Sequence, residues 1–225
     1  MRWLVLFAKP PLPGRAKTRL ADEIGPAAAA RIAEALLQET LALCEGLLTA
    51  SSEAAPRLVL AYTDAIEWFT PRLAADWRLV EQRGADPGER LGGVLEQIQP
   101  EADDATVFIG TDCPQMPPER IAEAFEALAE VDAVLGPCDD GGCYLLGVRG
   151  RLAAGALDDV GWSTDSALAD TEAALAAAGL TVAHLAPEFN VDTVGDLGRL
   201  AHGMASGTVR ALEALTRVLA DLDLA

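Results

Sequence analysis

Short apolar runs recur along the chain and alternate with segments of helical periodicity. Several runs lack the alternation of a half-exposed strand, and their β-branched and aromatic residues favour strands that are buried on both faces. The predicted strands span residues 3–8, 57–62, 78–81, 106–109, 133–136, 144–148 and 180–185. Strands separated by helices predict a mostly parallel sheet that is covered on both faces.

The segments between these strands carry apolar residues at helical spacing. We expect helices over 26–48, around 91–98, from Pro117–Pro118 onward, over 163–178 with Ser163 as the N-cap, near Asp196, and over 208–222. In the first helix, one face should carry Ile32, Leu36, Leu43 and Leu47. No linker divides the chain, so residues 1–225 are expected to form a single three-layer α/β/α domain.

The composition of the chain limits the kinds of partner that the protein is expected to bind. The chain has 225 residues, 51% of them hydrophobic, and a net charge of −18 from 35 acidic and 17 basic residues. This balance argues against nucleic acid or an anionic membrane as a partner, because both need a basic face. The apolar run at 3–8 is too short for a signal peptide, so a soluble cytoplasmic protein is expected. The four cysteines have no C-x-x-C spacing, which argues against a zinc site or a disulfide framework.

The segment after the first strand is rich in basic residues. Five of them precede the first acidic residue, Asp22, and they are Arg2, Lys9, Arg15, Lys17 and Arg19. This asymmetry predicts an anion-binding loop, and the alternative is an ordinary solvated basic loop. Because exposed loops contribute little to a core, charge reversal at Lys17 or Arg19 is expected to leave the fold intact.

A carboxylate follows the buried run at 106–109. The segment Gly110-Thr111-Asp112-Cys113-Pro114 ends the strand and places Asp112 at its carboxyl edge. Ligands bind at that edge in open α/β sheets, and a carboxylate there suits a divalent cation shared with phosphate oxygens. The alternative is that Asp112 only opens a turn.

Several familiar motifs are absent from the sequence. The basic loop lacks the glycines of a P-loop, no G-x-G-x-x-G follows the first strand, and the segment at 161–165 lacks the second glycine of a nucleophile elbow. These absences argue against P-loop kinases, dehydrogenases and serine hydrolases.

A set of motifs in fixed order resembles the bacterial DUF2064 family, glycosyltransferase-like proteins with a nucleotide-diphospho-sugar transferase (GT-A) fold. The resemblance rests on Phe7-Ala8-Lys9-Pro10, Pro13-Gly14, Lys17-Thr18-Arg19-Leu20, Gly88-Glu89-Arg90, Gly110-Thr111-Asp112-Cys113-Pro114, Gly136-Pro137, Asp140-Gly141-Gly142, Tyr144, Trp162-Ser163-Thr164, Val191-Asp192-Thr193 and Asp196-Leu197. The chain departs from the family pattern at Cys143, Asn190 and Val194-Gly195.

The resemblance implies roles for these residues. Ala8, Lys9 and Gly14 would line the nucleotide site, and Arg15, Lys17 and Arg19 would bind its phosphates, with Lys17 also catalytic. Asp112 and Asp192 would share one Mg²⁺ or Mn²⁺ ion. Without a cation, these two carboxylates are expected to repel each other, so that Asp112→Asn would not lower the stability of the metal-free protein.

Other segments would contact the substrate. The loop Asp139-Asp140-Gly141-Gly142 lacks bulk, so its carboxylates would bind sugar hydroxyls, and Asp140 could act as a base. The alternative for this loop is an ordinary turn. Trp162 would be a further substrate contact or simply a buried tryptophan beside a helix cap. Glu89 and Arg90 would form a binding loop before a helix, or only a surface ion pair.

The resemblance implies a metal-dependent enzyme that moves a sugar from a nucleotide-diphospho-sugar to a small acceptor. Two alternatives remain open. One is a nucleotidyltransferase that uses an NTP and releases pyrophosphate, and the other is a non-catalytic protein that binds a nucleotide sugar. The sequence does not indicate the oligomeric state.

Overall fold

A seven-stranded sheet forms the centre of the computed structural model, which describes residues 1–49, 55–73 and 76–224. The strands are β1 (Arg2–Ala8), β2 (Arg57–Tyr62), β3 (Arg78–Glu81), β4 (Ala105–Ile109), β5 (Ala133–Pro137), β6 (Cys143–Arg149) and β7 (Val182–His184). Their order in the sheet is β3-β2-β1-β4-β6-β5-β7. Only β6 runs antiparallel to its neighbours, β4 and β5. The predicted mostly parallel α/β fold is therefore confirmed.

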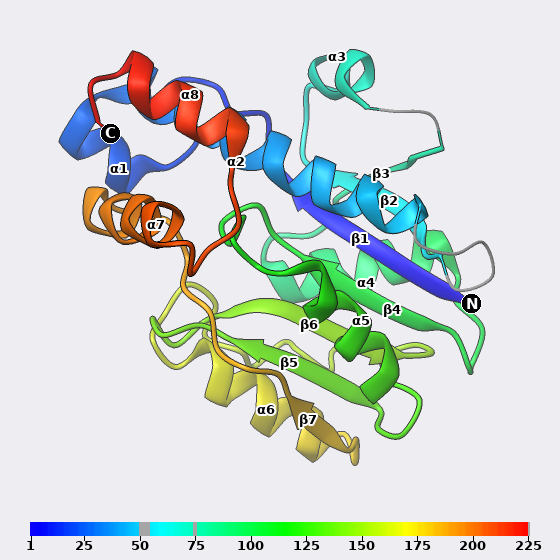
Figure 1. Ribbon diagram of the computed structural model, residues 1–225. Coiled ribbons are helices and arrows are strands. Elements are labelled where there is room, and N and C mark those ends of the chain that lie inside the picture. Colours follow the sequence, from blue (N-terminus) through cyan, green and yellow to red (C-terminus); the bar gives the residue numbers. More distant parts are fainter. Residues whose placement is uncertain (50–54, 74–75, 225) are drawn as a thin grey trace.

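Helices cover both faces of the sheet (Figure 1). They are α1 (Thr18–Ile24), α2 (Pro26–Gly46), α3 (Ile66–Phe69), α4 (Pro87–Ile98), α5 (Pro118–Ala127), α6 (Ala167–Ala177), α7 (Val194–Ser206) and α8 (Glu213–Asp221), with short 3-10 turns at Leu47–Thr49 and Thr70–Arg72. One hydrophobic core joins the sheet to α2 and α5, and a second joins its other face to α4 and α6. Each face of the sheet therefore has its own core.

A third core lies outside the sheet. It joins α1, the N-terminal half of α2, α7 and α8, and it includes Leu20, Ile32 and Leu36. Figure 1 shows α1, α7 and α8 gathered beyond the carboxyl end of β1. Helix α2 thus serves two cores along its length, because Leu43 packs into the sheet core. The predicted spacing places Ile32, Leu36 and Leu43 on one face of the helix, which meets the third core in its N-terminal half and the sheet core in its C-terminal half.

Some predicted helix boundaries differ from those in the structure. Ser163 has a left-handed backbone (φ +64°), and α6 begins after Ser166, which takes the N-cap position. The last helix begins at Glu213 instead of residue 208, and α4 begins four residues earlier than predicted. Helix α1 was not predicted. None of the described helices is long and apolar enough to cross a membrane.

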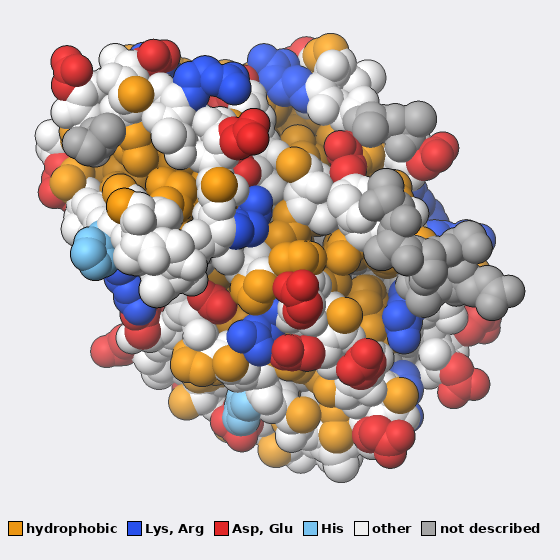
Figure 2. All heavy atoms as spheres, viewed as in Figure 1, with side chains coloured by type: hydrophobic (Ala, Val, Ile, Leu, Met, Phe, Trp, Pro, Cys, Tyr) orange, Lys and Arg blue, Asp and Glu red, His pale blue; other side chains and the backbone are white. Residues whose placement is uncertain are grey.

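Acidic, basic and hydrophobic side chains are distributed unevenly over the face of the molecule seen in Figure 2. Figure 2 shows acidic groups spread over one face, with basic groups in small separate clusters and hydrophobic groups gathered between α7 and α8. A broad basic surface for a polyanion is not visible on this face, in keeping with the net charge of −18.

Candidate active site

Two turns meet at the carboxyl edge of the sheet. The first follows β4 and contains Asp112, and the second precedes α7 and contains Asp192. The backbone oxygen of Asp112 accepts a hydrogen bond from the Val191 N–H at 2.8 Å. Gln115 Nε2 donates to the carbonyl oxygen of Phe189 at 2.6 Å, and this glutamine side chain is buried. These two hydrogen bonds hold the two turns side by side, although the turns lie eighty residues apart in sequence. We refer to residues 110–116 and 187–196 as the carboxylate turns.

The first carboxylate turn is also held from behind. Arg210 Nη2 donates to the carbonyl oxygen of Pro114 at 2.7 Å. The guanidinium group of Arg210 also contacts Glu39 of α2, whose buried carboxylate accepts a hydrogen bond from the Ala214 N–H. The segment before α8 therefore supports the turn that carries Asp112.

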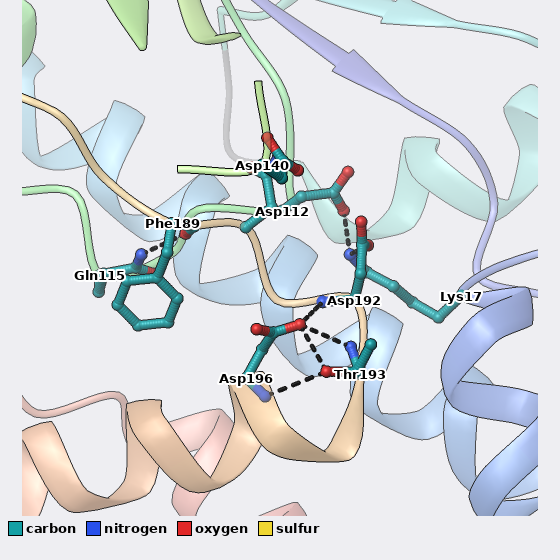
Figure 3. A network of polar contacts seen from close by, with 9 residues as sticks. Lys17, Asp112, Gln115, Asp140, Phe189, Asp192, Thr193 and Asp196 are labelled. Atoms are coloured by element: carbon teal, nitrogen blue, oxygen red, sulfur yellow. Dashed lines mark hydrogen bonds and ion pairs between the residues drawn. The ribbon is translucent and has the colours of Figure 1, made fainter. Parts of the chain in front are cut away.

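The second carboxylate turn ends in a capping box. The Asp196 carboxylate accepts hydrogen bonds from the backbone N–H groups of Asp192 and Thr193 and from the Thr193 hydroxyl, while Thr193 Oγ1 accepts from the Asp196 N–H (Figure 3). Burial opposes ionisation of Asp196, but these hydrogen bonds prevail and lower its pKa below the usual 3.8. The cap fixes the backbone at Asp192 and leaves its side chain free to face Asp112.

Lys17 joins the two carboxylates. Its Nζ forms ion pairs with Asp112 Oδ1 and with Asp192 Oδ1, the latter at 2.8 Å (Figure 3). The Lys17 side chain is only 7% exposed, whereas those of Asp112 and Asp192 are 48% and 32% exposed. Lys17 has a left-handed backbone (φ 49°, ψ 54°) at the start of α1, which is an unfavourable conformation for a residue with a Cβ. The strained turn directs a basic side chain inward.

This arrangement changes two expectations. Burial alone would lower the pKa of Lys17, but the negative charges of Asp112 and Asp192 outweigh it and raise this pKa above 10.5. The ammonium group therefore stays charged and neutralises the two carboxylates, so the expected repulsion in the metal-free protein is wrong. The expectation that charge reversal at Lys17 would leave the fold intact assumed an exposed side chain, whereas this side chain is buried and paired.

The other basic residues of the N-terminal segment are exposed. Lys9 and Arg19 form no ion pair with the described residues, and Arg15 pairs with Asp64 at the surface. Gly14 has φ +74° and open space where a side chain would lie. Ala8 ends β1, and its carbonyl oxygen accepts from Gln82 Nε2 at 3.4 Å. These positions leave the loop accessible to an anion, and their substrate contacts stay predictions.

The loop after β5 is tied to its neighbours. Asp139 forms an ion pair with Arg199 of α7. Asp140 accepts hydrogen bonds from the Gly142 N–H at 2.9 Å and from Asn190 Nδ2 at 3.1 Å. At Asn190, where the chain departs from the family pattern, the side-chain amide thus binds the Asp140 carboxylate. Asp139 and Asp140 remain exposed, and their catalytic and binding roles stay predictions.

The glycines of this loop serve packing. Gly141 has φ +84°, and a Cβ there would lie 2.0 Å from the carbonyl oxygen of Asp165. A Cβ at Gly142 would lie 3.1 Å from Asp140 Oδ1. The lack of bulk at Gly141 thus lets the segment before α6 approach, and it does not leave an open space for substrate.

Trp162 and the start of α4 lie close to Gly110 of the first carboxylate turn. Together with Phe7, Leu91, Phe108 and Gly110, Trp162 lines a small hollow of about 140 Å³. Its indole Nε1 is buried without a hydrogen-bond partner and faces Gly88. The tryptophan is therefore partly buried and also borders a space beside the carboxylate turns.

Glu89 and Arg90 lie in the first turn of α4 instead of in a loop before it. Glu89 accepts from the Ala85 N–H, and its own N–H donates to the Asp86 carboxylate that caps the helix. Arg90 donates to the carbonyl oxygens of Gly84 and Ala85. Both side chains stabilise the turn before α4, and among the described residues they do not pair with each other.

Sequence reasoning missed three residues of this region. Gln115 and Arg199 hold the carboxylate turns, and the Arg199 guanidinium lies 3.9 Å from the centre of the Phe189 ring. Gln82 bonds to Ala61 and Ala8 at the ends of β2 and β1. Gln82 directly follows β3, so the rule that selected Asp112, a polar residue at the carboxyl edge of a strand, could have found it.

The Asp112 and Asp192 carboxylates suit a divalent cation whose remaining coordination positions would be filled by substrate. In residues 1–49, 55–73 and 76–224, no group of three or more His, Cys, Asp or Glu side chains is arranged to hold a metal ion. Asp112 and Asp192 nevertheless converge on one positive charge and are both partly exposed. Mg²⁺ commonly binds one or two protein carboxylates together with phosphate oxygens and water. The donor set therefore suits a metal that arrives with a phosphate ligand.

Comparison with protein families shows which family the chain belongs to. Residues 30–164, more than half of its length, match the sequence profile of DUF2064, described as uncharacterized proteins conserved in bacteria. The chain therefore belongs to the DUF2064 family. The matched range includes Asp112 and the loop at 139–142, but Lys17 and Asp192 lie outside it. No curated protein sequence gives a match.

Solved structures share the fold. A "putative nucleotide-diphospho-sugar transferase" from Desulfovibrio desulfuricans is 29% identical, with a TM-score of 0.83 over 98% of this chain and 96% of that one. CMP:2-keto-3-deoxy-manno-octonic acid synthetase in complex with CTP is 14% identical, with a TM-score of 0.56 over 92% of this chain and 99% of that one. A 4-diphosphocytidyl-2C-methyl-D-erythritol synthase from Anaerococcus prevotii is 11% identical, with a TM-score of 0.58 over 91% and 96%. The last two show a common fold only.

Proposed function

We propose that this protein is a divalent-cation-dependent transferase that moves a glycosyl group from a nucleotide-diphospho-sugar to a small acceptor. The first comparison structure above, described as a "putative nucleotide-diphospho-sugar transferase", matches nearly the whole chain. The observation that carries the proposal is the meeting of Asp112, Asp192 and a basic loop at the carboxyl edge of β1 and β4. In open α/β sheets this edge is where ligands bind.

Different residues of the chain would bind the diphosphate, the metal ion and the acceptor. Lys9, Arg15 and Arg19, which are exposed on the basic loop, would hold the diphosphate by charge-assisted hydrogen bonds. Asp112 and Asp192 would bind Mg²⁺ or Mn²⁺, which supplies Lewis-acid neutralisation of the leaving diphosphate when bound. Asp139 or Asp140 would orient the acceptor hydroxyl, and Asp140 would take its proton.

Each carboxylate of the loop at 139–142 has spare acceptor capacity for this role. Asp140 accepts one hydrogen bond at each oxygen, which leaves lone pairs on both. The hollow beside Trp162 lies next to Gly110 and is lined mainly by apolar side chains, so it would take an apolar part of the acceptor or sugar.

A thermal-shift screen tests the proposal. Nucleoside diphosphates, nucleoside triphosphates and nucleotide sugars are each added with and without Mn²⁺. We expect at least one nucleotide sugar to raise the Tm by several degrees only when Mn²⁺ is present, because a ligand that binds the native state stabilises it. No stabilisation by any nucleotide with Mn²⁺ would contradict the proposal.

Nucleotidyl transfer is the second candidate, favoured by the fold that the chain shares with the synthetase solved with CTP. Here an NTP would be attacked at its α-phosphate and pyrophosphate would leave. Product analysis with the ligand found in the screen separates the two reactions. Release of a nucleoside diphosphate supports glycosyl transfer, and release of pyrophosphate supports nucleotidyl transfer.

A further inference from the structure

Lys17 occupies the position between the two carboxylates that a shared metal ion would need. Its Nζ contacts one oxygen of Asp112 and one of Asp192, and these are the side chains that would bind the metal. A lysine ammonium group and a divalent cation are both positive and cannot lie within contact distance of each other without strong repulsion. The two cations therefore compete for one place.

We propose that Lys17 acts as an internal cation that keeps the divalent metal off the Asp112–Asp192 pair until a nucleotide phosphate attracts the lysine away. The inference rests on the proposed function, because it concerns the same metal and the same phosphate. It adds an order of binding: the metal enters with the nucleotide and binds the free protein poorly.

Burial supports a specific role for this lysine. The Lys17 side chain is 7% exposed, although both of its partners are open to water and could be solvated without it. A simple surface ion pair contributes little to stability. The protein nevertheless buries this side chain and keeps its residue in a left-handed backbone conformation, which is unfavourable for a residue with a Cβ. Such strain is characteristic of functional sites.

The local structure allows the ammonium group to move. The carbonyl oxygen of Lys17 accepts the first α-helical hydrogen bond of α1, from the Ala21 N–H at 2.8 Å, so the backbone is fixed independently of the side chain. The loop before it, at 13–15, is exposed. A phosphate bound there would offer Lys17 a second anionic partner within the reach of its flexible stem. The side chain can exchange partners while α1 stays folded.

Calorimetry with Mn²⁺ alone, without nucleotide, tests the competition. The variant Lys17→Met keeps the length and apolar stem of the side chain and removes the charge. We expect it to bind Mn²⁺ at least about tenfold more tightly than the unmodified protein, because both carboxylates are freed. The matched control is Lys9→Met, which removes the same charge from an exposed position in the same loop and should bind Mn²⁺ no more than about twofold better.

Two further variants keep the test decisive. The double variant Lys17→Met/Asp192→Asn should not show the increased affinity for Mn²⁺, since one of the two metal ligands is neutral. If Lys17→Met fails to fold by circular dichroism, Lys17→Gln replaces it, and a gain in Mn²⁺ affinity is expected there too.

The outcomes separate this inference from the proposed function. Equal Mn²⁺ affinity of the unmodified protein and Lys17→Met would overturn the role of Lys17 and leave the metal-dependent transferase standing. The same holds if neither binds Mn²⁺ alone but the nucleotide screen shows Mn²⁺-dependent stabilisation. If Mn²⁺ has no effect in either experiment, both proposals fall.

Discussion

The two sides of the candidate site are held in different ways. The carboxylate turns are fixed by backbone bonds, by the buried side chain of Gln115, by Arg210 from behind and by the Thr193–Asp196 capping box. The basic loop at 9–16 has two internal backbone turns, from Leu12 and Arg15, and most of its charged side chains are exposed. The carboxylate turns, where a metal ion would bind, thus have a fixed backbone. The basic loop, where phosphate would bind, carries positive charge but makes few contacts that fix it.

Lys17 follows the basic loop in sequence but belongs to the opposite side in structure. Its ammonium group is buried against the carboxylate turns, while Lys9 and Arg19 face solvent. Substitutions with the same change of charge should therefore have very different effects in the two places. The following predictions test this difference, from the largest effect to the smallest.

Asp112→Asn should have the largest effect. With the donor found in the thermal-shift screen, we expect turnover to fall by about a thousandfold, because the metal loses one of two protein ligands. The metal-free variant should also be less stable by about 1 kcal/mol, since Lys17 keeps only one carboxylate. Steady-state kinetics and urea unfolding measure these effects. Asp22→Asn, which removes an exposed carboxylate from α1, is the control, and full turnover in Asp112→Asn would refute the role of Asp112.

Lys17→Glu and Arg19→Glu reverse charges two residues apart. The first should lower the free energy of unfolding by about 3 kcal/mol, because it places a third carboxylate between Asp112 and Asp192. The second should change it by less than about 0.5 kcal/mol and weaken nucleotide binding by about tenfold. Urea unfolding and calorimetry measure both. Similar stability of the two variants would show that Lys17 is as exposed as Arg19.

Asp196→Asn should have the smallest effect and a characteristic pH dependence. At pH 7 we expect a loss of about 1 kcal/mol, because the amide keeps one acceptor oxygen but loses the charge. The pKa of Asp196 is lowered by folding, so this contribution is fully present above the unfolded value near 3.8 and is lost as the pH falls through the lower folded value. Urea unfolding of both proteins from pH 6 to pH 3 should show their stabilities converging below about pH 3.8. A constant difference over this range would mean that the charge of Asp196 does not stabilise the cap.

Much of the fold could be predicted because burial leaves a clear pattern. A strand covered on both faces, such as β1, β2 or β4, has few polar residues to obscure its boundaries. Helix α1 was missed because it has seven residues and a single buried one, Leu20, and its basic start reads as a continuation of the loop. Its position depends on the third core, many of whose members belong to α7 and α8, far away in sequence.

The candidate site could be predicted in part. The rule that ligands bind at the carboxyl edge of the sheet selected Asp112, and the family resemblance added Asp192, and the structure brings both to one ammonium group. The role of Lys17 as the bridging cation could not be predicted, because a left-handed backbone and a buried side chain depend on the surrounding structure and not on local sequence. The metal ion, Mg²⁺ or Mn²⁺, stays a prediction.

The distribution of the site along the chain has a consequence for synthesis on the ribosome. Lys17 is made first, Asp112 follows ninety-five residues later, and Asp192 comes eighty residues after Asp112. At about 5–20 residues per second, the eighty residues between the two carboxylates take several seconds to appear. During that interval Lys17 has only one of its anionic partners, so the chain cannot yet hold both carboxylates in place. The candidate site becomes complete only after Asp192 has been made.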